Sequence, residues 1–232
     1  MNEFICGCKK SLPIALGYFP VAFSFGVLVV SSGLPLGLAT MISLTNLTSS
    51  GQFAGVSLML TNASYTEIAI TLLMINARYF LMSLSLSQKI DQKMNTLERM
   101  IISFGITDET FSLASVQEDV LTFRFMLGFI LVPIIGWTSG TLVGETFINV
   151  LPNSLQSAMG IALYGMFLAI IVPASSKSKK ILEVVLVSAV MSVLFFYMPI
   201  FDVLSSGVKL IIATLSGAVY GAWRYPIEEG EV

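Results

Sequence analysis

A single arginine lies deep inside an apolar stretch of the chain. Arg78 is near the middle of the run from Ile68 to Leu86, and Asn76 precedes it by two residues. An arginine at bilayer depth costs about 2.5–3.5 kcal/mol on insertion scales, so we expect Arg78 to face a partner or a watery cavity rather than lipid. Two interpretations follow. Arg78 marks a transport pathway, or it ties helices together through carbonyls or a carboxylate.

Three acidic residues could pair with the positive charge of Arg78 or carry a proton. Glu67 begins the same apolar run, and Asp108 and Glu109 form an acidic turn. A carboxylate within about 4–6 Å of Arg78 would stay ionised, whereas one buried without a partner would have a raised pKa and could take up a proton. We therefore assign proton or ion coupling to Asp108, Glu109 and Glu67. The plainer alternatives are a first-turn acid at Glu67 and a cap at Asp108 for a helix beginning near Glu109.

A polar, glycine-containing sequence from Asn46 to Gln52 interrupts another apolar run, Leu34–Leu60. A continuous lipid-facing helix is poorly supported there, so two half-helices are predicted. A half-helix beginning near Ser49–Gly51 would aim free N–H groups and its positive dipole end at an anion such as a substrate carboxylate. Close packing of another backbone on Gly51 and Gly55 is the alternative. The predicted substrate-binding residues are Ser49, Ser50, Gly51, Gln52, Asn76 and Arg78.

The composition indicates an integral membrane protein. Hydrophobic residues make up 55% of the 232 residues and charged residues only 11%, too few charges to cover a soluble domain. The apolar runs are about twenty residues long, which suits helices that cross the hydrocarbon core and is too long for barrel strands. We therefore expect an all-α polytopic membrane protein.

The same composition argues against an enzyme. The chain has no histidine, and its two cysteines, Cys6 and Cys8, lack the spacing of a zinc or haem site. Histidine-based metal chemistry, a Ser-His-Asp triad and a histidine proton relay are excluded. No GxxxxGK[ST] loop is present, so no ATP site is expected. We expect neither enzymatic activity nor a metal or other cofactor.

The positive charges predict the topology, because short cytoplasmic loops should hold the excess of Lys and Arg. The apolar runs cover about residues 12–30, 34–60, 67–86, 123–143, 155–172, 181–198 and 208–223. If the segment of about 34–61 re-enters and returns, only Lys209 lies near the outer side; a full crossing would place the cluster Lys177–Lys180 outside. We predict one transmembrane domain over residues 1–232, with about six spanning helices, the broken re-entrant pair, and both termini cytoplasmic.

The segment of about residues 98–120 leaves two possibilities open. Met100–Val120 could cross the membrane as a polar helix, which would give eight passes. We favour a cytoplasmic-side segment in which Met100–Ile106 and Phe111–Val116 form two short helices around the acidic turn.

Glycines repeat at four-residue spacing in the run of residues 123–143 and just beyond it, at Gly136, Gly140 and Gly144. This spacing is typical of a helix-contact face. The same face could instead be where a second membrane subunit docks.

Three sequence blocks, in this order and spacing, carry a resemblance to a known family. They are Ser-Gly-Gln-Phe-Ala at 50–54, Asn-Ala-Arg-Tyr-Phe-Leu-Met-Ser-Leu-Ser-Leu at 76–86, and Thr-Asp-Glu-Thr-Phe at 107–111. The chain resembles the AzlC/YgaZ family of branched-chain amino acid exporters. It departs from the family pattern at Tyr79, where histidine is frequent, and at Gly51, where a serine-like residue is usual.

The resemblance implies an inner-membrane exporter of branched-chain or other small apolar amino acids, acting with a small, separately encoded AzlD-like membrane subunit. No nucleic-acid partner is implied. Our hypothesis is secondary export driven by the proton or membrane-potential gradient. The alternative is a non-transporting membrane scaffold or sensor subunit in which an Arg78–Asp108 pair is purely structural. A channel is disfavoured, because no segment repeats polar residues along one helical face.

Overall fold

The part of the chain that the structure describes is mostly helical. The computed structural model describes residues 2–147, residues 171–226 except 174, 177, 202 and 205, and a few isolated positions between these stretches. Within these residues the only strand-like pairing is a bridge between Ile90 and Leu121. The chain divides into two compact units. One unit combines Met1–Val56 with Asn76–Leu163, and the other combines Ser57–Ile75 with Tyr164–Val232.

Four of the described helices are long and apolar enough to cross a membrane. They are α1 (Glu3–Ser31), α4 (Tyr65–Ser87), α7 (Phe123–Phe147) and α9 (Lys179–Tyr197). Each covers one of the predicted apolar runs. The last run forms α10 (Ser206–Arg224), which is not among these four, and the predicted run of residues 155–172 lies mostly outside the described residues. The count of six spans and the cytoplasmic position of the termini remain predictions.

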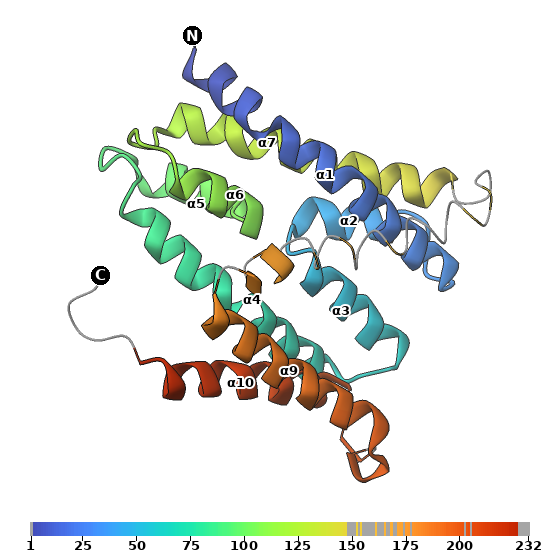
Figure 1. The fold of residues 1–232 in the computed structure, drawn as a ribbon. Coiled ribbons are helices and arrows are strands. Elements are labelled where there is room, and N and C mark those ends of the chain that lie inside the picture. The colour runs from blue at the N-terminus through green and yellow to red at the C-terminus, as the bar shows by residue number, and fades with distance from the viewer. Residues whose placement is uncertain are drawn as a thin grey trace. The chain divides into compact units, whose positions relative to one another are not determined.

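Helices α1 and α7 form the main contact of the first unit and run in the same direction (Figure 1). Gly128, near the start of α7, lies against the backbone carbonyl of Phe4, near the start of α1. Towards the other end, Gly144 lies against the carbonyl of Phe23. Because positions rise together along both helices, the pair is parallel. If both helices cross a membrane, they cross it in the same direction.

The glycines of α7 form the predicted helix-contact face. Added side chains at Gly136, Gly140 and Gly144 would each collide with the backbone of α1, at Ala15 and Phe19 for the first two. Small residues at this spacing let two helix backbones approach closely. The face is occupied within the chain, so the alternative that a second subunit docks on these three glycines is wrong.

The predicted break in the second apolar run is confirmed. The run forms two helices, α2 (Leu38–Thr45) and α3 (Ser50–Leu60), which Figure 1 shows as separate elements. Between them Ser49 has a φ of 49°, in the left-handed region that interrupts a helix. Helices of 8 and 11 residues rise about 12 and 16 Å, well short of the ~30 Å core. Neither helix spans a bilayer alone; re-entry remains a prediction.

The acidic segment also forms two short helices, α5 (Thr96–Phe104) and α6 (Asp108–Ser115), rather than one long helix. Both begin earlier than predicted, because each has a capping box that starts the helix upstream. Asn95 caps α5 and Thr107 caps α6. The expectation that Asp108 caps this helix is therefore wrong: Thr107 is the cap, and Asp108 is the first helical residue.

In the second unit α9 packs against α10, with the 3₁₀ turn η1 (Pro199–Phe201) in the connection. Gly217 of α10 lies against the side chain of Ser188 of α9. Glu183 accepts hydrogen bonds from two tyrosine hydroxyls, Tyr220 at 2.9 Å and Tyr225 at 2.6 Å. These contacts hold the ends of α9 and α10 together.

Candidate functional site

The arginine of the apolar run pairs with a carboxylate from the acidic turn. Arg78 Nη1 lies 2.8 Å from Asp108 Oδ2. Arg78 projects from the interior of α4, and Asp108 stands in the first turn of α6, where the Thr107 cap fixes its position. The side chains are 36% and 27% exposed, so the pair is not sealed inside the protein. A pair of this kind satisfies the demand that a charge at membrane depth has a partner.

Arg78 also contacts the start of α3. Its Nη2 donates to the Ser50 hydroxyl at 3.0 Å and to the Tyr79 hydroxyl at 3.3 Å. The Tyr79 hydroxyl in turn donates to the backbone carbonyl of Thr48 at 3.4 Å. The guanidinium thus joins α4, α6 and the break between α2 and α3. Its Nε is buried and has no hydrogen-bond partner.

Gln52 holds the break together from within. Its Oε1 accepts from the backbone N–H of Ser49 at 3.3 Å, and its Nε2 donates to the Ser43 hydroxyl of α2 at 3.1 Å. The Ser43 hydroxyl pairs with that of Thr141 on α7 at 2.8 Å. We expected Gln52 to contact a substrate. In this structure it is only 2% exposed and both ends of its amide are engaged within the protein.

Polar atoms without partners gather beside Gly51. A side chain at this glycine would collide with the Thr48 hydroxyl and lie 3.0 Å from Asn76 Oδ1. Both of these oxygens are buried and without a hydrogen-bond partner, as is Arg78 Nε. Buried polar groups are nearly always hydrogen-bonded, so such atoms call for an explanation. The first turn of α3 is therefore bordered by an incomplete polar shell.

The two acids of the turn have different partners. Glu109 accepts a hydrogen bond from the Tyr18 hydroxyl of α1, which also lies within hydrogen-bond distance of the Thr107 hydroxyl. Tyr18 was not predicted, because a single tyrosine in an apolar run gives no signal of its partner. Burial raises the pKa of Asp108; the neighbouring Arg78 opposes this effect and Glu109 adds to it.

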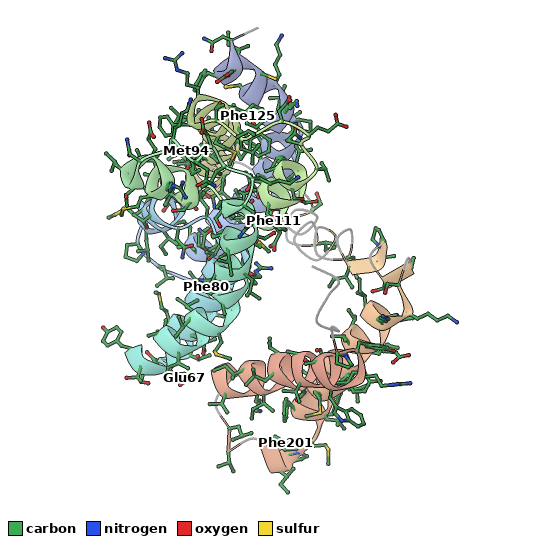
Figure 2. The ribbon with its side chains drawn as sticks, turned by 90° about the vertical axis from the view of Figure 1, so that its left-hand side faces the viewer. Glu67, Phe80, Met94, Phe111, Phe125 and Phe201 are labelled. Atoms are coloured by element: carbon green, nitrogen blue, oxygen red, sulfur yellow. The ribbon has the colours of Figure 1, made fainter. Side chains whose placement is uncertain are left out.

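Glu67 lies apart from this cluster along α4. It is in the first turn of the helix, where its backbone N–H donates to the Ser64 hydroxyl at 3.2 Å. It precedes Arg78 by eleven residues, or about 16 Å of helix rise. Figure 2 shows Glu67 near one end of α4 and Phe80 farther along the same helix. This placement matches the plainer alternative of a helix-start acid.

A buried acid that the sequence did not reveal holds the other half-helix. Glu145 of α7 is only 1% exposed and accepts from the backbone N–H of Gly37, where α2 begins. It also accepts from the Thr40 hydroxyl at 2.6 Å and the Thr40 N–H at 3.3 Å. Its position just after the apolar run resembled that of a loop acid. The available signal was its four-residue spacing from Thr141, which is also buried.

The described residues hold no group of three or more His, Cys, Asp or Glu side chains that could bind a metal ion.

Residues 13–151 match the sequence profile of the family described as "AzlC protein". The chain belongs to the AzlC family. The match contains every residue of the Arg78 cluster described above, as well as Gln52 and Glu145.

Relatives in this family are membrane proteins. The "Inner membrane protein YgaZ" of Escherichia coli (strain K12) is 25% identical over 205 residues, which cover 85% of this chain and 84% of that protein. An "Uncharacterized membrane protein" of Archaeoglobus fulgidus is 29% identical over 223 residues, covering 94% and 93%. Another of Helicobacter pylori is 31% identical over 153 residues, covering 62% and 66%. No solved structure matches.

Proposed function

We propose that this AzlC-family protein is a secondary exporter of branched-chain or other small apolar amino acids in the inner cell membrane. The observation that carries the proposal is the Arg78–Asp108 pair at the start of α3, beside buried polar atoms that lack partners. Ionisable residues at membrane depth mark substrate and ion pathways by default. The family membership and the printed name of the E. coli relative support a role in the membrane.

The site has groups for both ends of an amino acid. The substrate carboxylate would meet the Arg78 guanidinium and the Ser50 hydroxyl at the N-terminal end of α3, where free N–H groups favour an anion. The amino group would face Asp108. A proton on Asp108 would then compete with the amino group, and such exclusion is what exchange of a proton for an outgoing amino acid requires.

We also propose that the chain works with a small AzlD-like membrane subunit.

We further propose the six-span topology with both ends in the cytoplasm, which agrees with the parallel pairing of α1 and α7. One crossing between them, by α4, brings the chain back to the side from which α1 started. A second run that crossed fully, with no further crossing, would make α1 and α7 antiparallel.

The test is efflux of labelled leucine, isoleucine, valine and methionine from cells that contain this chain alone or with its small subunit. Arg78→Ala should abolish efflux while the protein still reaches the membrane. Arg99→Ala is the matched control, because Arg99 donates its Nε to the Met94 carbonyl, a group outside the site. Unchanged efflux from Arg78→Ala would refute the proposed role of this arginine. Absence of any efflux from the natural chain would favour the scaffold alternative.

A further inference from the structure

We infer that the Thr48 hydroxyl and the Asn76 amide oxygen form a subsite for the substrate ammonium group. This inference rests on the proposed function, since it assigns the part of the same site that would recognise the amino end. The two oxygens lie beside Gly51 and are buried without hydrogen-bond partners. Both can accept a hydrogen bond, as an ammonium donor requires.

A third unpaired group, on the arginine that binds Ser50, is of the opposite kind. Arg78 Nε can only donate, and it too is buried without a partner. A ligand that satisfies all three atoms must therefore bring a donor to the Asn76 oxygen and an acceptor to Arg78 Nε, while the Thr48 hydroxyl can accept or donate. A zwitterionic amino acid carries both within a few bond lengths. A simple anion could accept from Arg78 and from the Thr48 hydroxyl, but it would leave the Asn76 oxygen unpaired.

The contacts around these atoms keep them close to the ion pair. The Thr48 carbonyl accepts from the Tyr79 hydroxyl, which accepts from Arg78 Nη2. Asn76 lies beside Gly51, the residue after Ser50, whose hydroxyl is held by the same guanidinium nitrogen. An ammonium group has three N–H donors. Asp108 would supply the opposite charge, and the two neutral oxygens would receive the remaining donors and fix the orientation.

The missing side chain of Gly51 leaves room for both oxygens beside the start of α3. A Cβ at position 51 would lie closer to the Thr48 hydroxyl oxygen than Cβ atoms in proteins approach their neighbours. Position 51 has no hydroxyl of its own. The Thr48 hydroxyl lies in the space that a side chain at position 51 would occupy. The subsite belongs to the backbone break, since Thr48 is fixed there by its N–H, which donates to Asn46 Oδ1 at 3.0 Å.

The subsite predicts discrimination between an amino acid and the matching hydroxy acid. Labelled leucine counterflow would be measured in vesicles with the full chain and its small subunit, in competition with leucine or 2-hydroxy-4-methylpentanoate. The natural chain should prefer leucine by about tenfold or more, because the hydroxy acid lacks the ammonium donors. Thr48→Val and Asn76→Ala should each reduce this preference about fivefold or more, the effect of one lost hydrogen bond to a charged group.

Two further variants separate recognition from folding. Thr48→Ser keeps the hydroxyl and should keep the preference. Thr61→Val is the matched control, because the Thr61 hydroxyl is exposed and bonds only the carbonyls of its own helix. A purely structural role of Thr48 would lower both inhibition strengths together and leave their ratio unchanged, which would overturn the inference while the exporter proposal stands. Absence of leucine counterflow from the natural chain would overturn both.

Discussion

At the residue scale the ion pair between Arg78 and Asp108 matters most. Exchanging the two charges tests whether the pair serves efflux or only stability. Arg78→Asp combined with Asp108→Arg should restore the ion pair and the amount of protein in the membrane, but not efflux, because the cation would no longer project from α4. Each single variant should reduce both, since it leaves a charge without its partner. The measurements are labelled leucine efflux and membrane protein content.

Full recovery of efflux in the double variant would make the pair a structural bridge and favour the scaffold alternative. Arg78→Lys refines the result, because lysine keeps the charge but loses the planar fork of donors. Equal loss of efflux in Arg78→Lys and Arg78→Ala would indicate that the substrate carboxylate needs the guanidinium geometry.

The raised pKa of Asp108 predicts a pH dependence of export. Burial favours the protonated form, so Asp108 takes up a proton at a higher pH than an exposed aspartate does. If the coupled proton binds here, acidifying the cytoplasmic side should keep Asp108 protonated and lower efflux. Asp108→Asn should remove this acidic limb and leave efflux low at every pH. An acidic limb that persists in Asp108→Asn would assign the coupled proton to another group.

The sequence was sufficient to identify two site residues, Arg78 because an arginine is costly at membrane depth and Asp108 because it lies in an acidic turn. Arg78 and Asp108 stood out by charge, and the structure brings them together with Ser50. Sequence reasoning had no means of telling that Gln52 is fully engaged by Ser49 and Ser43, since those partners depend on how two short helices meet. Tyr18 and Glu145 escaped for the same reason: their significance lies in tertiary partners.

The element that deserves a test of its own is α2, whose start is held by a single carboxylate. Glu145→Ala would leave the half-buried Gly37 and Thr40 donors unpaired, which should destabilise the protein by about 1 kcal/mol. Glu145→Gln keeps one acceptor and should cost less. The free energy of unfolding in detergent is the measurement.

The matched control for this variant is Glu118→Ala, because Glu118 is exposed in the connection before α7. Hydrogen exchange of the α2 amides should rise in Glu145→Ala and stay unchanged in the control. Equal stability of the two variants would show that α2 is held by its apolar contacts alone.

Close packing of α1 on α7 predicts a strong effect of a single methyl group. Gly144→Ala would push a Cβ into the Phe23 carbonyl, and this backbone has no flexible end that could move aside. Overpacking of this kind costs about 1–3 kcal/mol. Gly17→Ala is the control, because no atom lies within 4 Å of a Cβ at Gly17. A melting temperature unchanged in Gly144→Ala would contradict the packing.

Helix existence followed from the sequence more reliably than helix ends did. Runs of apolar residues are long enough to be recognised without tertiary information, and the break at Asn46–Gln52 showed in its polar residues. The start of α5 was misplaced because the capping box of Asn95 and Glu98 lies in the most hydrophilic linker, before the apolar residues that follow Arg99. The helical partner of the Gly136 face needed the structure, since spacing marks a contact without naming its other side.

On the scale of the whole molecule, the order of crossings is the feature that can be tested. The segment before α7 contacts the start of α1: the Thr122 hydroxyl donates to Glu3 at 2.7 Å, and Lys10 donates to the Gln117 side chain. These residues must lie on one side of a membrane. With Cys6 and Cys8 replaced by serine, Glu118→Cys should react with an impermeant thiol reagent from the cytoplasmic side.

Labelling from the outer side would contradict the predicted cytoplasmic N-terminus, given that contact. Cysteine at Asn62, in the turn after α3, provides the comparison, since the re-entrant topology places it outside. The same reagent should reach the two positions from opposite sides. Labelling of both from the cytoplasm would mean that the second run crosses fully and that the segment Met100–Val120 crosses as well.

The parallel contact of α1 with α7 has a consequence for biosynthesis. Glu3 and Thr122 are separated by 119 positions, so α1 leaves the ribosome long before its partner exists. At 5–20 residues per second, its glycine-matched surface waits roughly 6–24 s. During that interval the face of α1 that later packs on α7 must be covered by lipid or by an insertion factor. A chain that stops before α7 would present an unmatched helix to the proteases that remove unassembled membrane proteins.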